Sequence, residues 1–145
     1  MEDVNMLKGI PDIISPELLK ILDEMGHGDE IVIADGNFPT ASMGKREVRA
    51  DGHGVPEMLD AILQLFPLDT YVEAPVALME VVPGDPVVPV IWDEFKEIIE
   101  KRDPAKIEYM ERFSFYERAK KAYAIIATGE KAIYANVLLK KGVVK

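Results

Sequence analysis

The 145-residue chain has no cysteine, one tryptophan and only two histidines, and these scarcities limit its chemistry. Without cysteine it has no disulfide, no thiol nucleophile and no thiolate ligand for a metal ion. Its apolar runs fall far short of the roughly 20 residues that a membrane-spanning helix requires. Its beginning, MEDVNMLKGIPDII, is acidic and lacks the long apolar stretch of a secretion signal, which favours a cytoplasmic location.

Positive charge is also scarce. The 17 lysines and arginines are outnumbered by 26 aspartates and glutamates, which gives a formal net charge of −9 and an isoelectric point near 4.7. An acidic surface repels phosphate backbones, and the densest basic stretch, KRDPAK at 101–106, contains no aromatic residue. We therefore expect neither nucleic acid nor a membrane as a partner, and a small molecule instead.

The rest of the composition suits a folded domain of alternating helices and strands. Hydrophobic residues make up 48% of the chain and charged residues 30%, and 145 residues allow one domain with its own core. Apolar residues at helical spacing predict helices at 16–25, 56–66, 90–101 and 114–121. β-rich runs predict strands at 31–34, 45–50, 74–82, 106–112, 122–128 and 132–140.

The order of these segments predicts the architecture. Ser15 is expected to cap the first helix, and Gly26 is expected to end it. Gly129-Glu130 fits a two-residue turn between the last two strands, so we expect the chain to end in a β-hairpin. Together these features predict an α/β fold with three layers, α/β/α, around a mixed sheet. Ligands of such sheets bind at the carboxyl ends of strands, where Asp35 is expected to lie.

His27 lies between Gly26 and Gly28, just before a predicted strand. The glycines leave room for a ligand to approach the imidazole, whose pKa near neutrality suits it to give and take protons. Taken alone, this spacing favours a histidine that caps the C-terminal end of the first helix. A metal site with Asp29 and Asp35 is a third interpretation, although the spacing matches no standard zinc pattern.

Asp35 and His53 each have two interpretations. Asp35 ends the apolar run Ile-Val-Ile-Ala, and it is either a ligand-binding carboxylate at the end of a strand or a turn residue before Gly36. His53 also lies between two glycines, and it is better explained as a loop histidine near a helix start than as a site residue.

The C-terminal third offers further polar groups near predicted strand ends. Arg112 begins the stretch RFSFYER, and its guanidinium can bind neighbouring hydroxyls or a carboxylate, or else form a salt bridge with Glu111 or Glu117. Tyr134 and Asn136 are two residues apart on a predicted strand, so they point to the same face. They offer donors and acceptors to a polyol, although a sheet surface also uses these residue types freely.

Three stretches together resemble a known family: LKGIPDIISPELLKILDEMGHGDEIVIADGNFP, VRADG and ERFSFYERAKKAYAIIATGEKAIYANVLLKKGV. They are similar to the ribose pyranase and fucose mutarotase family, and most of all to its L-fucose mutarotase branch. The similarity runs from Met6 nearly to the end of the chain and is weak only over about 83–108. It implies one sugar mutarotase domain over residues 1–145, of which residues 1–5 form an N-terminal extension.

The resemblance implies an enzyme that interconverts sugar anomers and ring forms by acid/base-assisted ring opening, without metal or cofactor. The family's members assemble as rings of subunits, commonly decamers, in which a neighbour completes each site. The family's acid/base histidine matches His27. Its sugar-binding residues match Asp35, Arg112, Tyr134, Ala135 and Asn136.

Two departures and one agreement bear on the substrate. Gly36-Asn37 stand where many fucose-type members have Ala-His, and Ala135 stands where many have glycine. Ribose pyranases carry a histidine at the position of Arg112, so we expect an L-fucose mutarotase. Tyr134 or water is then the second proton-transfer partner. The alternatives are a ribose pyranase acting on D-ribose, a non-catalytic monosaccharide-binding protein on the same scaffold, and a metal-dependent isomerase.

Overall fold

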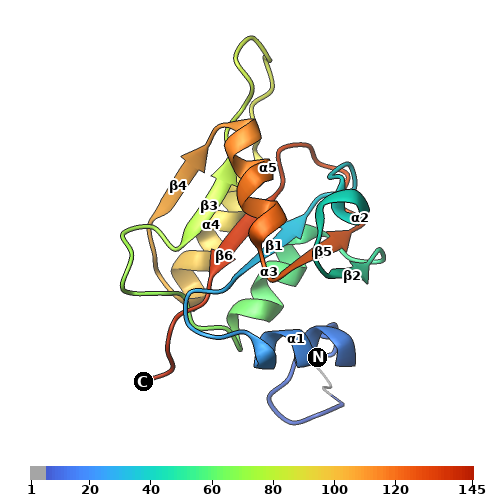
Figure 1. Ribbon diagram of the computed structural model, residues 1–145, viewed down its shortest axis with the longest axis vertical. Coiled ribbons are helices and arrows are strands. Elements are labelled where there is room, and N and C mark those ends of the chain that lie inside the picture. The colour runs from blue at the N-terminus through green and yellow to red at the C-terminus, as the bar shows by residue number, and fades with distance from the viewer. Residues whose placement is uncertain (1–5) are drawn as a thin grey trace.

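A six-stranded sheet with helices on both faces organises the computed structural model, which describes residues 6–145 (Figure 1). The expected N-terminal extension, residues 1–5, lies outside the described residues. The strands are β1 (Glu30–Ala34), β2 (Glu47–Ala50), β3 (Val76–Met79), β4 (Ile107–Met110), β5 (Ala124–Thr128) and β6 (Val137–Lys140). The helices are α1 (Pro16–Glu24), α2 (Thr40–Met43), α3 (Val55–Leu63), α4 (Ile91–Arg102) and α5 (Arg112–Lys121).

The sheet is mixed, as predicted. Its strand order is β2-β5-β1-β6-β3-β4. β6 runs antiparallel to both of its neighbours, β1 and β3, whereas the β1–β5, β2–β5 and β3–β4 pairs are parallel. The carboxyl ends of five strands therefore lie along one edge of the sheet, together with the amino end of β6.

The predicted closing hairpin is wrong. β5 and β6 follow one another in the chain, but β1 lies between them and pairs with both. The segment 129–136 is therefore a loop that crosses the end of β1, and not a two-residue turn. Apolar period and turn residues indicate where strands begin and end, but they carry no information about which third strand inserts between two neighbours.

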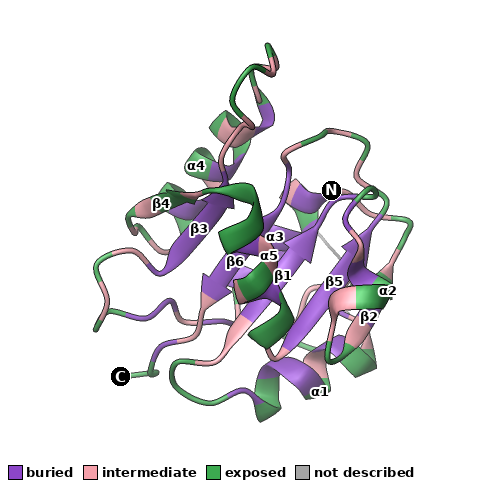
Figure 2. Cartoon of the chain, turned by 45° about the horizontal axis from the view of Figure 1, so that its top comes forward, coloured by how far each residue is buried: buried purple, intermediate pink, exposed green. Residues whose placement is uncertain are grey.

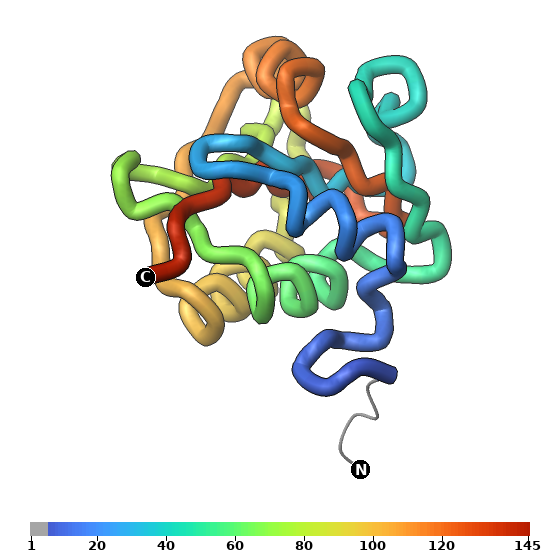
Figure 3. The backbone as a smooth tube through the Cα atoms, turned by 60° about the horizontal axis from the view of Figure 1, so that its bottom comes forward, coloured from blue at the N-terminus to red at the C-terminus, as the bar shows by residue number. Residues whose placement is uncertain are grey.

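Two apolar cores fill the space between the sheet and its helices. Alternate residues of each strand point to opposite faces, so Ile31 and Ile33 of β1 join one core and Val32 and Ala34 join the other. The first core packs against α1, α3 and α4, and the second packs against α2 and α5. Figure 2 shows the buried strands between partly exposed helices, and Figure 3 shows α3 and α4 side by side on one face. The three-layer prediction is confirmed.

Most predicted element boundaries hold to within two or three residues. The Ser15 cap is confirmed, since its side chain accepts a hydrogen bond from the Leu18 backbone N–H at 3.1 Å. α1 ends at Glu24, one residue earlier than expected, and Met25 rather than Gly26 forms its C-cap. Arg112 was expected at the end of a strand, but it is the first residue of α5, directly after β4.

Candidate functional site

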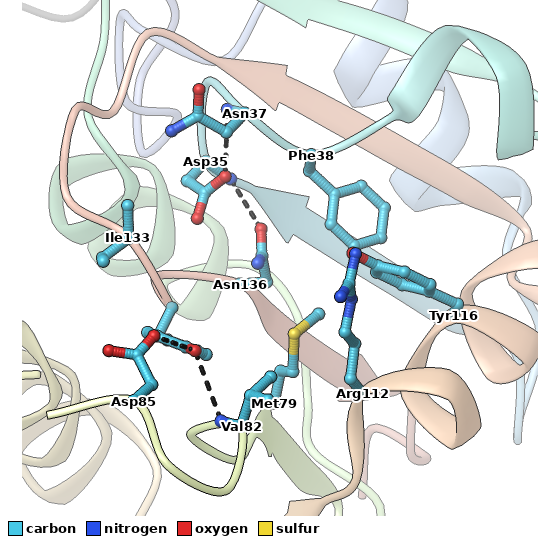
Figure 4. Close-up of a pocket in the computed structure, with 11 residues that line it drawn as sticks. Asp35, Asn37, Phe38, Met79, Val82, Asp85, Arg112, Tyr116, Ile133 and Asn136 are labelled. Carbon is cyan, nitrogen blue, oxygen red and sulfur yellow. Dashed lines mark hydrogen bonds between the residues drawn. The ribbon is translucent and has the colours of Figure 1, made fainter. Parts of the chain in front are cut away.

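A cavity of about 250 Å³ opens at the carboxyl edge of the sheet, between the ends of β1, β3 and β4 and the start of β6 (Figure 4). Such edges are where open α/β sheets bind ligands. The cavity brings together four predicted residues from three separate stretches of the chain. These are Asp35, Arg112, Tyr134 and Asn136. Asn37, part of one of the two departures from the family pattern, also lines the cavity. Sequence reasoning did not predict the other lining residues, which are Phe38, Met79, Val82, Asp85, Tyr116 and Ile133.

Asp35 is held rigidly at the floor of the cavity. Its carboxylate accepts hydrogen bonds from the backbone N–H groups of Asn37 and Ala135, at 3.1 and 3.2 Å. The residue is 95% buried, and burial raises the pKa of its carboxyl above the ordinary value, although the backbone donors oppose this. The turn interpretation of Asp35 is confirmed by the hydrogen bond from the Asn37 backbone N–H, and the same residue lines the cavity, where ligand binding stays a prediction.

Asn136 faces Asp35, and its side-chain amide nitrogen has no hydrogen-bond partner within residues 6–145. Its side-chain oxygen accepts a hydrogen bond from the Asp35 backbone N–H at 2.8 Å. The amide nitrogen is left to donate to a ligand. Ala135, between Asn136 and Tyr134, does not line the cavity, because its methyl group is buried in the core and its N–H is given to Asp35. Ala135 therefore acts on the cavity through Asp35.

Tyr134 has an unusual backbone conformation that is held by three contacts. Its φ of +57° lies in the left-handed region, which costs a non-glycine residue about 1–2 kcal/mol. The indole N–H of Trp92 donates to the Tyr134 carbonyl oxygen at 2.8 Å. The phenol donates to Asp85 at 2.6 Å and accepts a longer hydrogen bond, 3.3 Å, from the Val82 backbone N–H. The hydrogen bond to Asp85 raises the pKa of the phenol above its ordinary value.

Arg112 forms the wall opposite Tyr134. Its Nε donates to the Tyr116 hydroxyl at 3.1 Å, and its guanidinium lies 5.3 Å from the centres of the Phe113 and Tyr116 rings. The predicted alternative of a salt bridge with Glu111 or Glu117 is not found. Glu111 caps α5, and Glu117 pairs with Lys120. The guanidinium therefore keeps N–H groups directed at the cavity (Figure 4).

His27 is not in this cavity. It precedes β1, whereas Asp35 follows it, and a five-residue strand is about 16 Å long. Its Nε2 lies 3.0 Å from Oδ1 of Asp69, and its ring packs against Tyr71 with centroids 5.1 Å apart. The helix-cap interpretation is not supported either, since Met25 caps α1 and the partner of the imidazole is a carboxylate.

Asp69 keeps its charge beside the half-exposed imidazole. The Tyr71 backbone N–H is the main cause of a lowered pKa of the Asp69 carboxyl, and the hydrogen bond with His27 adds to it. A buried carboxylate at one ring nitrogen fixes the orientation of the imidazole and leaves the other nitrogen for a ligand. Gly28, with a φ of +90°, allows the sharp turn that carries the chain from His27 into β1.

The remaining candidates lie apart from the cavity. His53 sits near the start of α3, where its Nδ1 is 3.1 Å from Glu57, as expected of a loop histidine. The metal interpretation requires His27 and Asp35 to lie close together, but they lie at opposite ends of β1. Within residues 6–145, no three histidine, aspartate or glutamate side chains gather into a group that could hold a metal ion.

Comparisons with known proteins point to one family. The model of the RbsD / FucU transport protein family matches residues 8–144. The fucose mutarotase of Mus musculus is 54% identical over 143 residues, which cover 94% of each chain. An L-fucose mutarotase of Actinobacillus pleuropneumoniae is 52% identical over 140 residues, which cover 95% of this chain and 97% of the other.

A solved structure agrees with these matches. The crystal structure of the fucose mutarotase of Streptococcus pneumoniae in complex with L-fucose superposes with a TM-score of 0.92. It is 55% identical and covers 96% of this chain and all of that chain. None of the helices within residues 6–145 has the length and apolar character needed to cross a membrane.

Proposed function

This chain belongs to the RbsD / FucU family, and from that membership and the geometry of the cavity we propose that it is an L-fucose mutarotase. The enzyme interconverts the α and β anomers of L-fucose by opening and closing the sugar ring. The observation that carries the proposal is the convergence of Asp35, Arg112 and Asn136 on one cavity. Carboxylate, guanidinium and amide groups in fixed positions are suited to recognising several hydroxyls of one sugar.

The size of the cavity supports a single sugar ring as substrate. Sites for drug-sized ligands span about 300–1,000 Å³. A cavity of about 250 Å³ therefore suits a monosaccharide and not a longer chain. Phe38 and Tyr116 pack edge to face with ring centres 5.6 Å apart, and they give the cavity an apolar wall for the methyl group and carbon face of a deoxy sugar.

Mutarotation requires two proton movements. One group removes the proton of the anomeric hydroxyl, and another protonates the ring oxygen as the C–O bond breaks. The open-chain aldehyde then rotates about the C1–C2 bond and closes from its other face. We assign protonation of the ring oxygen to His27 and removal of the hydroxyl proton to Tyr134. Asp35, Arg112 and Asn136 hold the sugar so that the reacting atoms stay aligned.

His27 reaches the sugar from a second copy of the chain. Within one copy, β1 separates it from the cavity, so His27 and Asp35 cannot contact one sugar ring. The family resemblance implies rings of subunits, and we propose a ring-shaped homo-oligomer, a decamer, in which each copy lends His27 to its neighbour. Exposed apolar side chains lie near both parts, with Tyr71 beside His27 and Phe113 and Ile133 beside the cavity.

The resemblance also supports the remaining assignments. We propose that residues 1–145 act as one sugar mutarotase domain with residues 1–5 as an extension, and that it works in the cytoplasm. No metal or other cofactor takes part in the proposed scheme. D-Ribose is the second candidate substrate, and Arg112 argues against it, because ribose pyranases carry histidine there.

The test is NMR saturation transfer between the α and β anomeric protons of L-fucose. We expect the intact protein to accelerate exchange, and His27→Ala to lower the enzymatic rate about 10²–10⁴-fold. The matched control is His53→Ala, which removes the other glycine-flanked histidine and is expected to keep the rate.

Each other outcome identifies a rival. Faster pyranose–furanose exchange of D-ribose than of L-fucose anomers would indicate a ribose pyranase. Saturable binding of L-fucose without acceleration of exchange would indicate a sugar-binding protein. Loss of activity on chelation would indicate a metal-dependent isomerase.

A further inference from the structure

The hydroxyl group of Tyr134 already donates its hydrogen in a hydrogen bond to Asp85. It carries one hydrogen, and this hydrogen points to Asp85 at 2.6 Å, the short distance typical of a hydroxyl that donates to a carboxylate (Figure 4). The Val82 N–H occupies part of the acceptor side at 3.3 Å. The phenol therefore presents a sugar with an oxygen lone pair and not with a proton.

Asp85 is held in place independently of Tyr134. Its other carboxylate oxygen accepts the backbone N–H of Val87 at 3.1 Å, which forms a tight turn in the segment between β3 and α4. Figure 1 shows this segment projecting beyond the carboxyl edge of the sheet. The Trp92 indole, at the start of α4, fixes the Tyr134 carbonyl from the same side. The carboxylate and the phenol are thus positioned by separate elements that meet at the cavity.

A protonated phenol cannot accept a proton and keep its own. Because the hydrogen bond to Asp85 raises the pKa of Tyr134 above its ordinary value, the phenol is neutral at physiological pH. It can take the proton of the anomeric hydroxyl only if its own proton leaves at the same time. The carboxylate of Asp85, 2.6 Å away, is the group placed to receive it.

We propose that Asp85 sets the direction of proton transfer at Tyr134, so that the phenol relays the proton of the anomeric hydroxyl to the Asp85 carboxylate. The inference rests on the proposed function, which gives Tyr134 the second proton transfer. Asp85 is a positioning residue in this scheme, since it acts on the sugar through Tyr134.

The relay balances in protons and electrons. The anomeric O–H bond breaks and an O–H bond to the phenol oxygen forms, while the original phenol O–H bond breaks and an O–H bond to Asp85 forms. The electron pair of the anomeric O–H bond becomes the second bond of the aldehyde, and the ring C–O pair stays on the ring oxygen. That oxygen takes the proton of His27. Ring closure reverses every transfer.

The test is a double-mutant cycle on the rate of anomer exchange of L-fucose, with kcat and KM measured separately. Asp85→Asn keeps an acceptor for the phenol but removes the base, and we expect kcat to fall about 10²-fold while KM changes less than about threefold. In a Tyr134→Phe background, Asp85→Asn is expected to have almost no further effect, because the two residues act as one unit. Asp93→Asn, an exposed acid of the first turn of α4, is the matched control.

Three results would overturn the relay while the mutarotase function stands. They are an Asp85→Asn variant with unchanged kcat, a Tyr134→Phe variant with unchanged kcat, and an Asp85→Asn effect that is as large without the phenol as with it. Should Asp85→Asn fail to fold, Asp85→Glu and Asp85→Gln provide the same contrast of carboxylate and amide. Absence of acceleration by the unmodified protein would instead contradict the proposed function.

Discussion

Two inactive variants are expected to restore activity to each other when their copies share an oligomer. His27→Ala lacks the proton donor, and Asp35→Asn lacks a carboxylate that holds the sugar. If each site joins His27 of one copy to the cavity of another, an oligomer of both variants contains some sites in which both parts are intact. If each site lies within one copy, every site in such a mixture is defective.

The expected magnitude follows from the arrangement of the site. In a random one-to-one mixture, half of the cavities and half of the histidines are intact, so about one quarter of the sites have both. The background of each variant alone is expected to be about 10²–10⁴-fold below the unmodified enzyme. One quarter of full activity therefore stands well above either background.

The assay requires oligomers that contain copies of both variants. The two variants are co-expressed with different affinity tags, purified over both tags in succession, and compared with each variant alone by saturation transfer on L-fucose. A matched mixture of His27→Ala with His53→Ala serves as the control. In this mixture the His53→Ala copies keep both His27 and the cavity residues. Activity that stays at the background level in doubly tagged oligomers would refute the shared site and require His27 to act elsewhere.

Two further predictions concern stability. Gly129→Ala is expected to lower the free energy of unfolding by about 3 kcal/mol in urea denaturation, because the added Cβ would clash with the Asp51 backbone oxygen. Gly52→Ala is the control, because the space around Gly52 is open. It is expected to change the free energy of unfolding by less than about 0.5 kcal/mol. Burial raises the pKa of Asp35 in the folded protein, so its contribution to stability is lost as pH rises from the ordinary value of 3.8 through the raised one. The free energy of unfolding of Asp35→Asn relative to the unmodified protein should therefore increase as the pH rises above 3.8. A difference that stays flat or decreases would show that the pKa of Asp35 is not raised.

Local signals predicted the elements of the fold well and their pairing less well. The Ser15 cap and the apolar spacing that follows it predicted α1, and the unbroken run that ends at Ala34 predicted β1, because these features depend on neighbours in the chain. The pairing of β1 with both β5 and β6 depends on contacts across the whole chain. A glycine that fits a two-residue turn, Gly129, therefore indicated a hairpin that the fold does not contain.

The sequence likewise predicted some residues of the candidate site and not others. Asp35, Arg112 and Asn136 carry recognisable chemistry at strand ends, and the structure brings them to one cavity. Asp69 and Asp85 were missed, because each is one acid among many in a strongly acidic chain and its partner is distant in sequence. The resemblance was weak over the segment that contains Asp85, and the sequence did not show that Trp92, the chain's single tryptophan, contacts Tyr134.

The position of β6 has a consequence for biosynthesis. It leaves the ribosome after the other five strands of this sheet, yet it lies in the middle of the sheet between β1 and β3. Until it emerges, β1 can pair only with β5 and β3 only with β4, so each has one unpaired edge. Asp35 also lacks its hydrogen-bond partner Asn136, which lies 101 residues later in the chain. The nascent chain cannot complete its sheet or its cavity during most of translation, so a released fragment that ends before β6 presents two exposed apolar edges to cellular quality control.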